Sequence, residues 1–390
     1  MIQPAHRVSA SKEYYFSSKL QEVREMSANG TPVINLGIGN PDLPPPGPVV
    51  RKLTEAAVHP DVHGYQPYRG VTALRNAFAR WYAAYYHVDL NPDREVLPLI
   101  GSKEGIFYIS LAFLNPGDRV LVPDVGYPAY KSVTELIGAV PLMYEISEKT
   151  GWLPDFNALE HMDLSGVKLM WVNYPNMPSG TPPTETLFKD LVRFGRKNNI
   201  LVCQDNPYSF ILSDQVMSIL RVPGARDVAV ELNSLSKAYN MAGWRIGVLA
   251  GAQEYLDKIF IVQSNVESGM FKPLQLAAVE AMRQPPEWFE SMNKTYRERK
   301  EVLFRIMDFL GCRYEENSAG LFVWARVPDR SDGFAFSDKL LYGSRVFITP
   351  GGVFGDHGKQ YIRASLCEDI RVLREALTRI KQNWENGNET

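Results

Sequence analysis

The chain has 390 residues, more than one hydrophobic core usually organises, so we expect two domains. With 45% hydrophobic and 22% charged residues, the composition is that of a folded globular protein and excludes a collagen-like or disordered chain. The 42 basic and 44 acidic residues give a formal net charge of -2, so no overall positive field attracts nucleic acid or an anionic membrane.

The cysteines and the N-terminal sequence indicate in which cellular compartment the protein is found. Cys203, Cys312 and Cys367 are widely spaced and form no C-x-x-C pair, which argues against a disulfide framework and a thiolate metal site. The opening MIQPAHRVSASKEYYF lacks the apolar core of a signal peptide, and no later run has the length of a membrane span. We therefore predict a cytoplasmic protein with no metal, nucleic-acid or membrane partner.

After a proline-rich connector at 41–48, short apolar runs alternate with amphipathic stretches. This alternation predicts an α/β sheet covered by helices. Helices are expected at 103–114 and at 185–198, where apolar residues recur at helical spacing. The predicted strands are 119–122, 140–144, 168–172, 200–203, 228–232 and 246–250.

From about residue 286 the pattern changes. A long charged helix is predicted through 310, followed by short strands at 320–326, 345–349 and 360–365 and a closing helix. This region reads as a second, smaller domain.

Ligands of open α/β sheets bind beyond the carboxyl ends of the strands, so residues just after each run are the first candidates. Asn173, Asp205 and the tetrad Ser234-Leu235-Ser236-Lys237 occupy such places. A lysine becomes a nucleophile when desolvation or a neighbouring cation lowers its pKa, and Arg245 lies close by in the sequence. The alternative for Lys237 is an ordinary solvated surface charge.

Asp205 and Tyr208 suit a pyridine ring. A carboxylate facing a pyridine nitrogen keeps it protonated, which makes the ring an electron sink, and the tyrosine can donate to a phenolic oxygen on that ring. The structural alternatives are a turn or helix-capping aspartate and a packed aromatic.

Three further sequence features are suited to binding a phosphate, a planar ring and a carboxylate. Gly101, Ser102 and Lys103 open a predicted helix, whose exposed amides favour a phosphate, although a simple helix cap explains them too. Tyr127 offers a face for stacking on a planar ring, or for core packing. Arg363 lies in a predicted strand, where its guanidinium suits a substrate carboxylate or an interdomain ion pair.

Seven stretches in this order resemble the class I and II aminotransferases of pyridoxal-phosphate (PLP) fold type I, over nearly the whole chain. Within that family, the sequence of these stretches is most similar to the branch that contains LL-diaminopimelate and aspartate aminotransferases. The stretches are LGIGNPDLPPP, GYQPYRGVTALRNAFARWY, GSKEGIFYISLAFLNPGDRVLVPDVGYPAY, NYPNMPSG, CQDNPY, SLSKAYNMAGWRIG and ITPGGVFGDHGKQYIRASL.

The resemblance implies a mostly parallel, mixed central sheet with helices on both faces, over residues 46–285, and a smaller α/β domain formed by 286–390 with the N-terminal 1–45. It implies amino transfer between an L-amino acid and a 2-oxo acid by a ping-pong mechanism through a Schiff base at Lys237. It also implies a homodimer with shared active sites.

Carried over residue by residue, the resemblance makes Lys237, Asp205 and Tyr208 catalytic. Arg363 and the Gly39 backbone would hold the substrate, with Tyr14 or Tyr15 as further lining residues. The remaining cofactor contacts would be Ser102, the Lys103 backbone, Tyr127, Ser234, Ser236, Arg245 and, reaching into the neighbouring subunit, Tyr65.

One position departs from the family pattern, because the chain reads Met177-Pro178-Ser179-Gly180 where the family has Asn-Pro-Thr-Gly. A thioether cannot donate the hydrogen bond that the asparagine gives to the ring oxygen. We therefore predict a raised pKa for the Schiff base. Asn176, one residue earlier, is a candidate to compensate.

Two other functions are compatible with the same sequence features. C–S β-lyases and aminocyclopropane-carboxylate synthases resemble the same motifs and keep the fold. A PLP-binding effector domain of a transcription regulator is disfavoured, because the chain has no room for a helix-turn-helix domain and no basic recognition helix. No motif identifies the amino donor or the oxo-acid acceptor.

Overall fold

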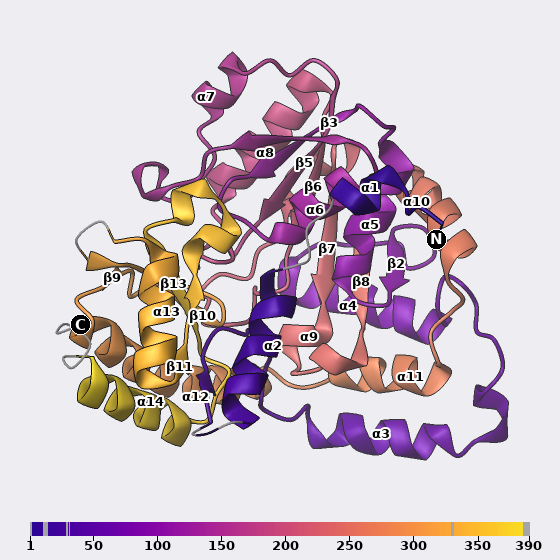
Figure 1. The fold of residues 1–390 in the computed structure, drawn as a ribbon. Helices are drawn as coiled ribbons and strands as arrows, with labels where there is room; N and C mark the ends of the chain where they lie inside the picture. The colour runs from indigo at the N-terminus through magenta and orange to yellow at the C-terminus, as the bar shows by residue number, and fades with distance from the viewer. Residues whose placement is uncertain (1, 11–14, 29, 31, 329–330, 385–390) are drawn as a thin grey trace.

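A computed structural model describes residues 2–10, 15–28, 30, 32–328 and 331–384 of the chain. Its centre is a mixed sheet of seven strands among the described residues, in the order β2-β8-β7-β6-β5-β3-β4 (Figure 1). The strands are β2 (Val96–Leu99), β3 (Arg119–Pro123), β4 (Val140–Tyr144), β5 (Val167–Asn173), β6 (Leu201–Asp205), β7 (Ala229–Ser234) and β8 (Gly247–Gly251).

The sheet is mostly parallel. Strand β8 runs antiparallel to both of its neighbours, β2 and β7, whereas the pairs from β7 to β4 are parallel. The strands carry apolar residues at successive positions because both faces are covered. In β5, Leu169 and Trp171 pack on one face while Met170 and Val172 pack on the other.

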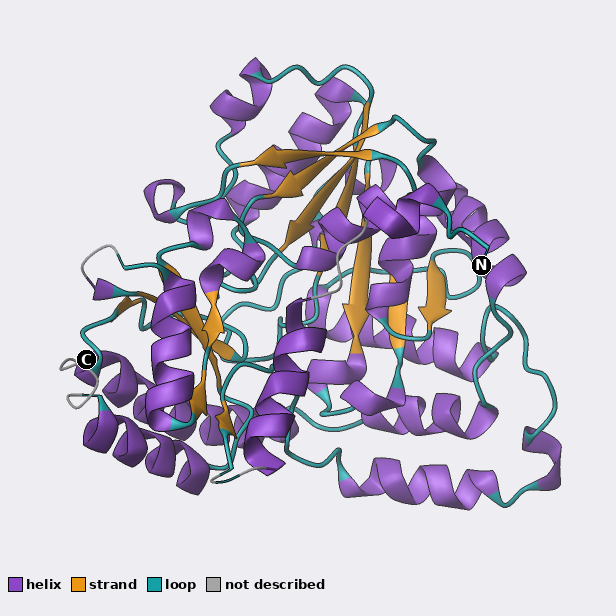
Figure 2. Cartoon of the chain, in the orientation of Figure 1, coloured by secondary structure: helices purple, strands orange, loops and turns teal. Residues whose placement is uncertain are grey.

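Helices cover both faces (Figure 2). One face packs against α5, α6 and α10, and the other against α4, α8 and α11. The helices of the chain are α1 (His6–Ala10), α2 (Tyr15–Ala28), α3 (Gly47–Ala57), α4 (Thr72–Tyr86), α5 (Ser102–Phe113), α6 (Pro128–Leu136), α7 (Phe156–His161), α8 (Glu185–Asn198), α9 (Leu235–Ala238), α10 (Gln253–Val266), α11 (Lys272–Ala281), α12 (Glu287–Phe309), α13 (Gly333–Ser344) and α14 (Ile370–Asn383).

Local signals explain where the helices begin and end. The Thr184 hydroxyl caps α8 by accepting from the Leu187 amide at 3.1 Å, and Asn199 closes the helix in the left-handed conformation. The predicted helix at 185–198 is therefore confirmed with its bounds.

The C-terminal third of the chain forms its own antiparallel sheet beside α12, α13 and α14 (Figure 1). Its strands pair in the order β12-β13-β10-β9. Strands β1 and β11 form a separate short parallel pair, in which Ile34 of β1 pairs with Val346 of β11. The division into 46–285 and 286–390 with 1–45 stays a prediction, which this pairing supports. These strands are β1 (Ile34–Asn35), β9 (Arg313–Tyr314), β10 (Phe322–Arg326), β11 (Val346–Phe347), β12 (Thr349–Pro350) and β13 (Tyr361–Ser365).

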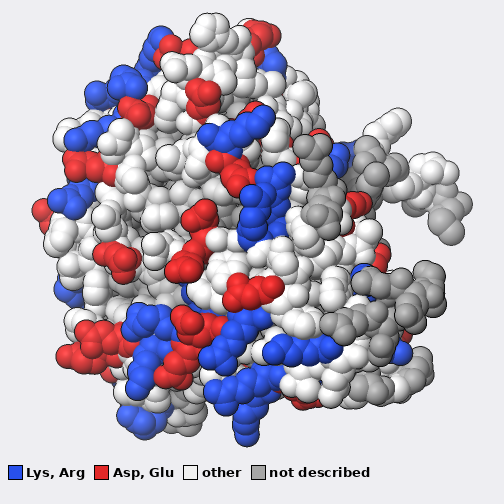
Figure 3. Space-filling model, turned by 90° about the vertical axis from the view of Figure 1, so that its left-hand side faces the viewer, with Lys and Arg blue, Asp and Glu red and all other residues white. Residues whose placement is uncertain are grey.

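Two further properties concern the distribution of surface charge and the apolar character of the helices. On the face drawn in Figure 3, acidic and basic side chains alternate, in keeping with the net charge of -2. Among the described residues, no helix combines the length and the apolar character that a membrane crossing requires.

Candidate active site

A cavity of about 460 Å³ lies at the carboxyl ends of the parallel strands, a size that suits a small organic ligand. Asn173 ends β5, Asp205 ends β6 and Ser234 ends β7, and all three line it. Because β8 runs in the opposite direction, Arg245, two residues before it, reaches the same edge.

The cavity brings together most of the side chains that the sequence indicates. Tyr65 does not line it and is 94% exposed, and Asn176 does not line it either. Tyr14 lies outside the described residues. The predicted residues that do line the cavity are Gly39, Ser102, Lys103, Tyr127, Asp205, Tyr208, Ser234, Ser236, Lys237, Arg245 and Arg363.

Lys237 lies on the short helix α9, which directly follows β7. Its Nζ donates to the carbonyl of Gly39 at 2.7 Å. Burial lowers the pKa of its amine to about 8, and the guanidinium groups of Arg363 and Arg245 lower it too. With this pKa roughly a tenth of the amine is neutral at pH 7, and the neutral amine is the nucleophilic form.

Asp205 is buried at the end of β6. Its Oδ2 accepts a hydrogen bond of 2.8 Å from the Tyr130 hydroxyl, whereas Oδ1 has no hydrogen-bond partner among the described residues. Burial raises the pKa of this carboxyl to about 6, and the bond from Tyr130 opposes that rise. An unpaired carboxylate oxygen at a cavity wall calls for a donor from the ligand.

Hydroxyl groups and a guanidinium lie close to one another in the cavity lining. Ser234 caps α9 and its Oγ donates to Ser236 Oγ at 2.8 Å, beside Ser102 at the start of α5. Gly101 precedes α5 with φ 84°, and a Cβ there would lie 2.2 Å from Arg245 Nη2. The guanidinium can therefore approach the start of α5 only because this residue is glycine, and the group as a whole suits an anion.

Arg363 comes from β13 of the smaller sheet and is 5% exposed. Its Nη2 donates to the Gly37 carbonyl at 2.7 Å and its Nη1 to the Met177 sulfur at 3.1 Å. The guanidinium carbon lies 3.9 Å from the ring centroid of Phe322 and 4.6 Å from that of Phe354. Aromatic contacts on a buried guanidinium fix its orientation while leaving its charge available.

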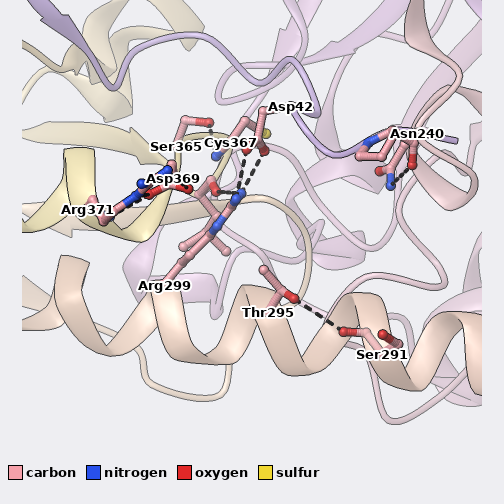
Figure 4. A network of polar contacts seen from close by, with 11 residues as sticks. Asp42, Asn240, Ser291, Thr295, Arg299, Ser365, Cys367, Asp369 and Arg371 are labelled. Atoms are coloured by element: carbon pink, nitrogen blue, oxygen red, sulfur yellow. Dashed lines mark hydrogen bonds and ion pairs between the residues drawn. The ribbon is translucent and has the colours of Figure 1, made fainter.

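The segment that carries Gly37 and Gly39 is anchored at Asp42. Both oxygens of Asp42 accept from Arg299 of α12, at 2.6 and 2.7 Å, and Figure 4 shows the guanidinium directed at that carboxylate. Arg299 also donates to the Leu366 carbonyl at 2.9 Å. This bidentate pair joins the N-terminal segment to the C-terminal third of the chain beside the cavity.

Asn176 is not brought to the cavity, because its side chain is used within its own loop. Its Nδ2 donates to the Asn173 carbonyl and its Oδ1 accepts from Ser179. Met177, the next residue, lines the cavity and is 6% exposed. The loop is therefore not shifted by one residue, and the structure does not support Asn176 as the replacement for the missing asparagine.

Sequence reasoning missed Tyr130, Phe322 and Phe354 as lining residues. Tyr130 had a signal that could have been used, since it follows Tyr127 at the i+3 spacing of one helix face. No local signal marks the two phenylalanines, because their role depends on contact with Arg363 across the fold.

The residues present fit pyridoxal 5′-phosphate. The unpaired Asp205 Oδ1 suits a protonated pyridine nitrogen, the serine hydroxyls with Arg245 suit a phosphate, and the Lys237 amine suits a carbonyl carbon. The fit rests on the chemistry of these donors and acceptors in one cavity.

Comparison with known proteins gives the same result. Residues 31–380 match the family model "Aminotransferase class I and II". LL-diaminopimelate aminotransferases of Natranaerobius thermophilus and Aquifex aeolicus are each 38% identical to the chain. The alignments cover 97% and 98% of this chain and 99% of each relative.

Solved structures agree over the same length. The BacF structure from Bacillus subtilis superposes with a TM-score of 0.93 at 37% identity, covering 98% of both chains. The aspartate aminotransferase of Thermotoga maritima has a TM-score of 0.89 at 28% identity, covering 98% of this chain and 100% of that one. The expected fold type I is thus confirmed, and the chain belongs to the class I and II aminotransferases, enzymes that transfer an amino group between an amino acid and a 2-oxo acid with pyridoxal phosphate.

Proposed function

We propose that this cavity is the site of amino transfer and that Lys237 is the residue that binds the cofactor covalently. The observation that carries the proposal is that the low-pKa amine of Lys237 and the unpaired oxygen of Asp205 line the same cavity. The cofactor supplies an electron-withdrawing ring that stabilises negative charge at the substrate Cα.

Eight residues that line the cavity would hold that cofactor. Asp205 would accept a hydrogen bond from its pyridine nitrogen, Tyr127 would stack on the ring, and Tyr208 would donate to the ring oxygen. The phosphate would be held by Ser102 and the Lys103 backbone at the start of α5, and by Ser234, Ser236 and Arg245.

Arg363 would bind the substrate α-carboxylate through its guanidinium fork, with the Gly39 backbone beside it. This contact orients the Cα–H bond toward Lys237, whose Nζ accepts the proton from Cα. The amino acid and the oxo acid share the α-carboxylate, so one arginine serves both halves of a ping-pong reaction.

Replacing Lys237 with alanine tests the proposal. Lys237→Ala should still bind the cofactor, because Asp205 and the phosphate-binding groups remain, but turnover should fall by at least about 10²-fold. A variant that interconverts amino and oxo acids at the parent rate would contradict the assignment. Release of pyruvate and ammonia without an acceptor would instead indicate a β-lyase.

The substrate is best sought by a screen of amino donors with 2-oxoglutarate or pyruvate, followed through the absorbance of the bound cofactor. LL-diaminopimelate belongs in the screen because relatives at 38% identity bear that name. The aspartate aminotransferase among the solved structures adds aspartate. Tyr14, which the sequence suggests as a lining residue, is a position to vary once a donor is known.

A homodimer with shared sites is part of the proposal. Tyr65 is 94% exposed and lies outside the cavity of its own chain, which suits a residue that reaches a partner's phosphate. If Tyr65 acts in the partner, mixing Tyr65→Ala with Lys237→Ala chains should recover part of the activity, through mixed dimers with one intact site. Mixtures no more active than the separate variants would contradict shared sites.

A cytoplasmic location also remains proposed, supported by the buried free thiols of Cys203, Cys312 and Cys367.

A further inference from the structure

The end of β3 is joined to the segment 354–357 by a group of polar contacts, which we call the β3 clamp. It consists of the side chains of Asp124, Glu145 and His357. Asp124 accepts from the Asp356 amide at 2.8 Å and from the His357 amide at 3.2 Å, and its Oδ2 also contacts His357 Nδ1. His357 Nε2 lies 3.5 Å from Glu145 Oε1.

The backbones at this place are in direct contact. The Gly126 amide donates to the Phe354 carbonyl at 2.9 Å. Gly355 has φ 149°, and a Cβ on it would lie 1.1 Å from the Asp124 carbonyl oxygen. No other residue type fits so close to that carbonyl, so the chain is shaped for contact between these two segments.

Phe354 connects the clamp to the cavity. Its carbonyl accepts from Gly126, while its ring lines the cavity 4.6 Å from the guanidinium carbon of Arg363. The clamp residues themselves do not line the cavity. An effect of Asp124 or His357 on ligand binding must therefore pass through Phe354 or its neighbours.

We propose that Asp124 and His357 are positioning residues for the substrate carboxylate, because the clamp holds Phe354 against the end of β3 and Phe354 sets the orientation of Arg363. A guanidinium binds a carboxylate through two parallel hydrogen bonds only when its plane is correctly held. This inference rests on the proposed role of Arg363.

The test uses the cofactor-loaded protein and propionate, an unreactive monocarboxylate whose binding is followed through the absorbance of the bound cofactor. His357→Ala should weaken propionate binding about tenfold, because a misoriented Arg363 would form one charge-assisted hydrogen bond fewer to the carboxylate. The side chain of His357 is 43% exposed, so the variant should fold. Cofactor affinity and the melting temperature should stay near the parent values.

Two matched variants separate positioning from general damage. His357→Asn keeps a side-chain donor near Asp124 and should restore binding to within about threefold of the parent. Lys359→Ala removes an exposed ion pair with Asp356 in the same segment and should leave propionate binding unchanged. Parent-like propionate affinity in His357→Ala would overturn the proposal, as would equal weakening in His357→Asn.

The route through Phe354 and the role of Arg363 are tested separately. In a Phe354→Leu background, His357→Ala should have almost no further effect, because both changes act on one contact. A full additional loss would overturn the route. If Arg363→Lys binds propionate as the parent does, the proposed carboxylate site itself is wrong; if only Arg363→Lys weakens binding, the proposed function stands and the clamp fails.

Discussion

The Tyr130 hydroxyl donates a 2.8 Å hydrogen bond to Oδ2 of Asp205, and both side chains are buried. The ring of Tyr130 is stacked on Trp171, with centroids 5.1 Å apart and planes 3° from parallel, so the hydroxyl cannot easily turn away. This bond stabilises the ionised form of Asp205, and Oδ1 is left to face the ligand.

Tyr130→Phe should therefore weaken cofactor binding. Without the donor, burial raises the pKa of Asp205 further, and less of the carboxylate is ionised to pair with a protonated pyridine. We expect about a tenfold loss of affinity for pyridoxal phosphate, measured by titrating the cofactor-free protein. Tyr144→Phe is the matched control, because that buried hydroxyl donates to the Trp171 carbonyl. Equal losses in both variants would show that packing, and not the bond to Asp205, is responsible.

Asp205 should also make the stability of the cofactor-free protein depend on pH. Its pKa is raised from 3.8 to about 6 in the folded chain, so between those values the folded state binds more protons than the unfolded state. The free energy of unfolding should then decrease as the pH rises from about 4 to 6, by on the order of 3 kcal/mol from this group. Urea unfolding of the parent and of Asp205→Asn at several pH values isolates that contribution, and parallel curves would contradict it.

The sequence predicted most of the central sheet because its strands are continuous apolar runs. The strand at 140–144 is confirmed with its bounds, and the strand at 119–122 and four others are confirmed with ends moved by one or two residues. Strand β6 extends beyond the predicted end at 203. The buried polar residues Gln204 and Asp205 continue its pairing with β5. Strand β2 was missed, since VLPL is short and contains a proline.

Candidate residues were found where chemistry follows a strand directly, as at Asp205 and Lys237. Phe322 and Phe354 were missed because only tertiary contacts bring them to the cavity. Phe354 belongs to a one-turn helix, and only the packing of the smaller sheet brings it to Arg363. Periodicity and turn chemistry carry no information on such contacts.

The amine of Lys237 should control the rate of cofactor capture. Its pKa of about 8 predicts that the rate at which the cofactor-free protein binds pyridoxal phosphate rises with pH and levels off above 8, as the neutral amine forms. Arg363→Gln removes one cation that lowers this pKa, so the midpoint should move to higher pH. Stopped-flow absorbance measures both, and a midpoint that stays in place would contradict the electrostatic contribution of Arg363.

Met177→Asn should lower the pKa of the Schiff base at Lys237. Met177 lines the cavity and its sulfur accepts from Arg363, but it cannot donate to the ring oxygen as an asparagine can. A hydrogen bond to that oxygen disperses its negative charge. The less negative oxygen then stabilises the neighbouring protonated imine less, which lowers the pKa of the imine. A pH titration of the cofactor absorbance gives the value directly. Met177→Leu is the control, since it adds no donor and should not lower the pKa; an unchanged pKa in Met177→Asn would refute the prediction.

The ion pair between Arg299 and Asp42 should matter for stability far more than the exposed pairs near it. Arg299→Ala leaves the Asp42 carboxylate without its bidentate partner and frees the segment that carries Gly39. Breaking a buried pair in this way costs about 3 to 5 kcal/mol, and the lower half of that range applies here because the Asp42 side chain is 29% exposed. Arg371→Ala, which removes the exposed pair with Asp369 seen in the same view (Figure 4), should have no measurable effect. Chemical denaturation of the cofactor-free variants measures the difference; equal stabilities would mean that the segment 37–42 is held by its backbone contacts, and that Arg299 is dispensable to the fold.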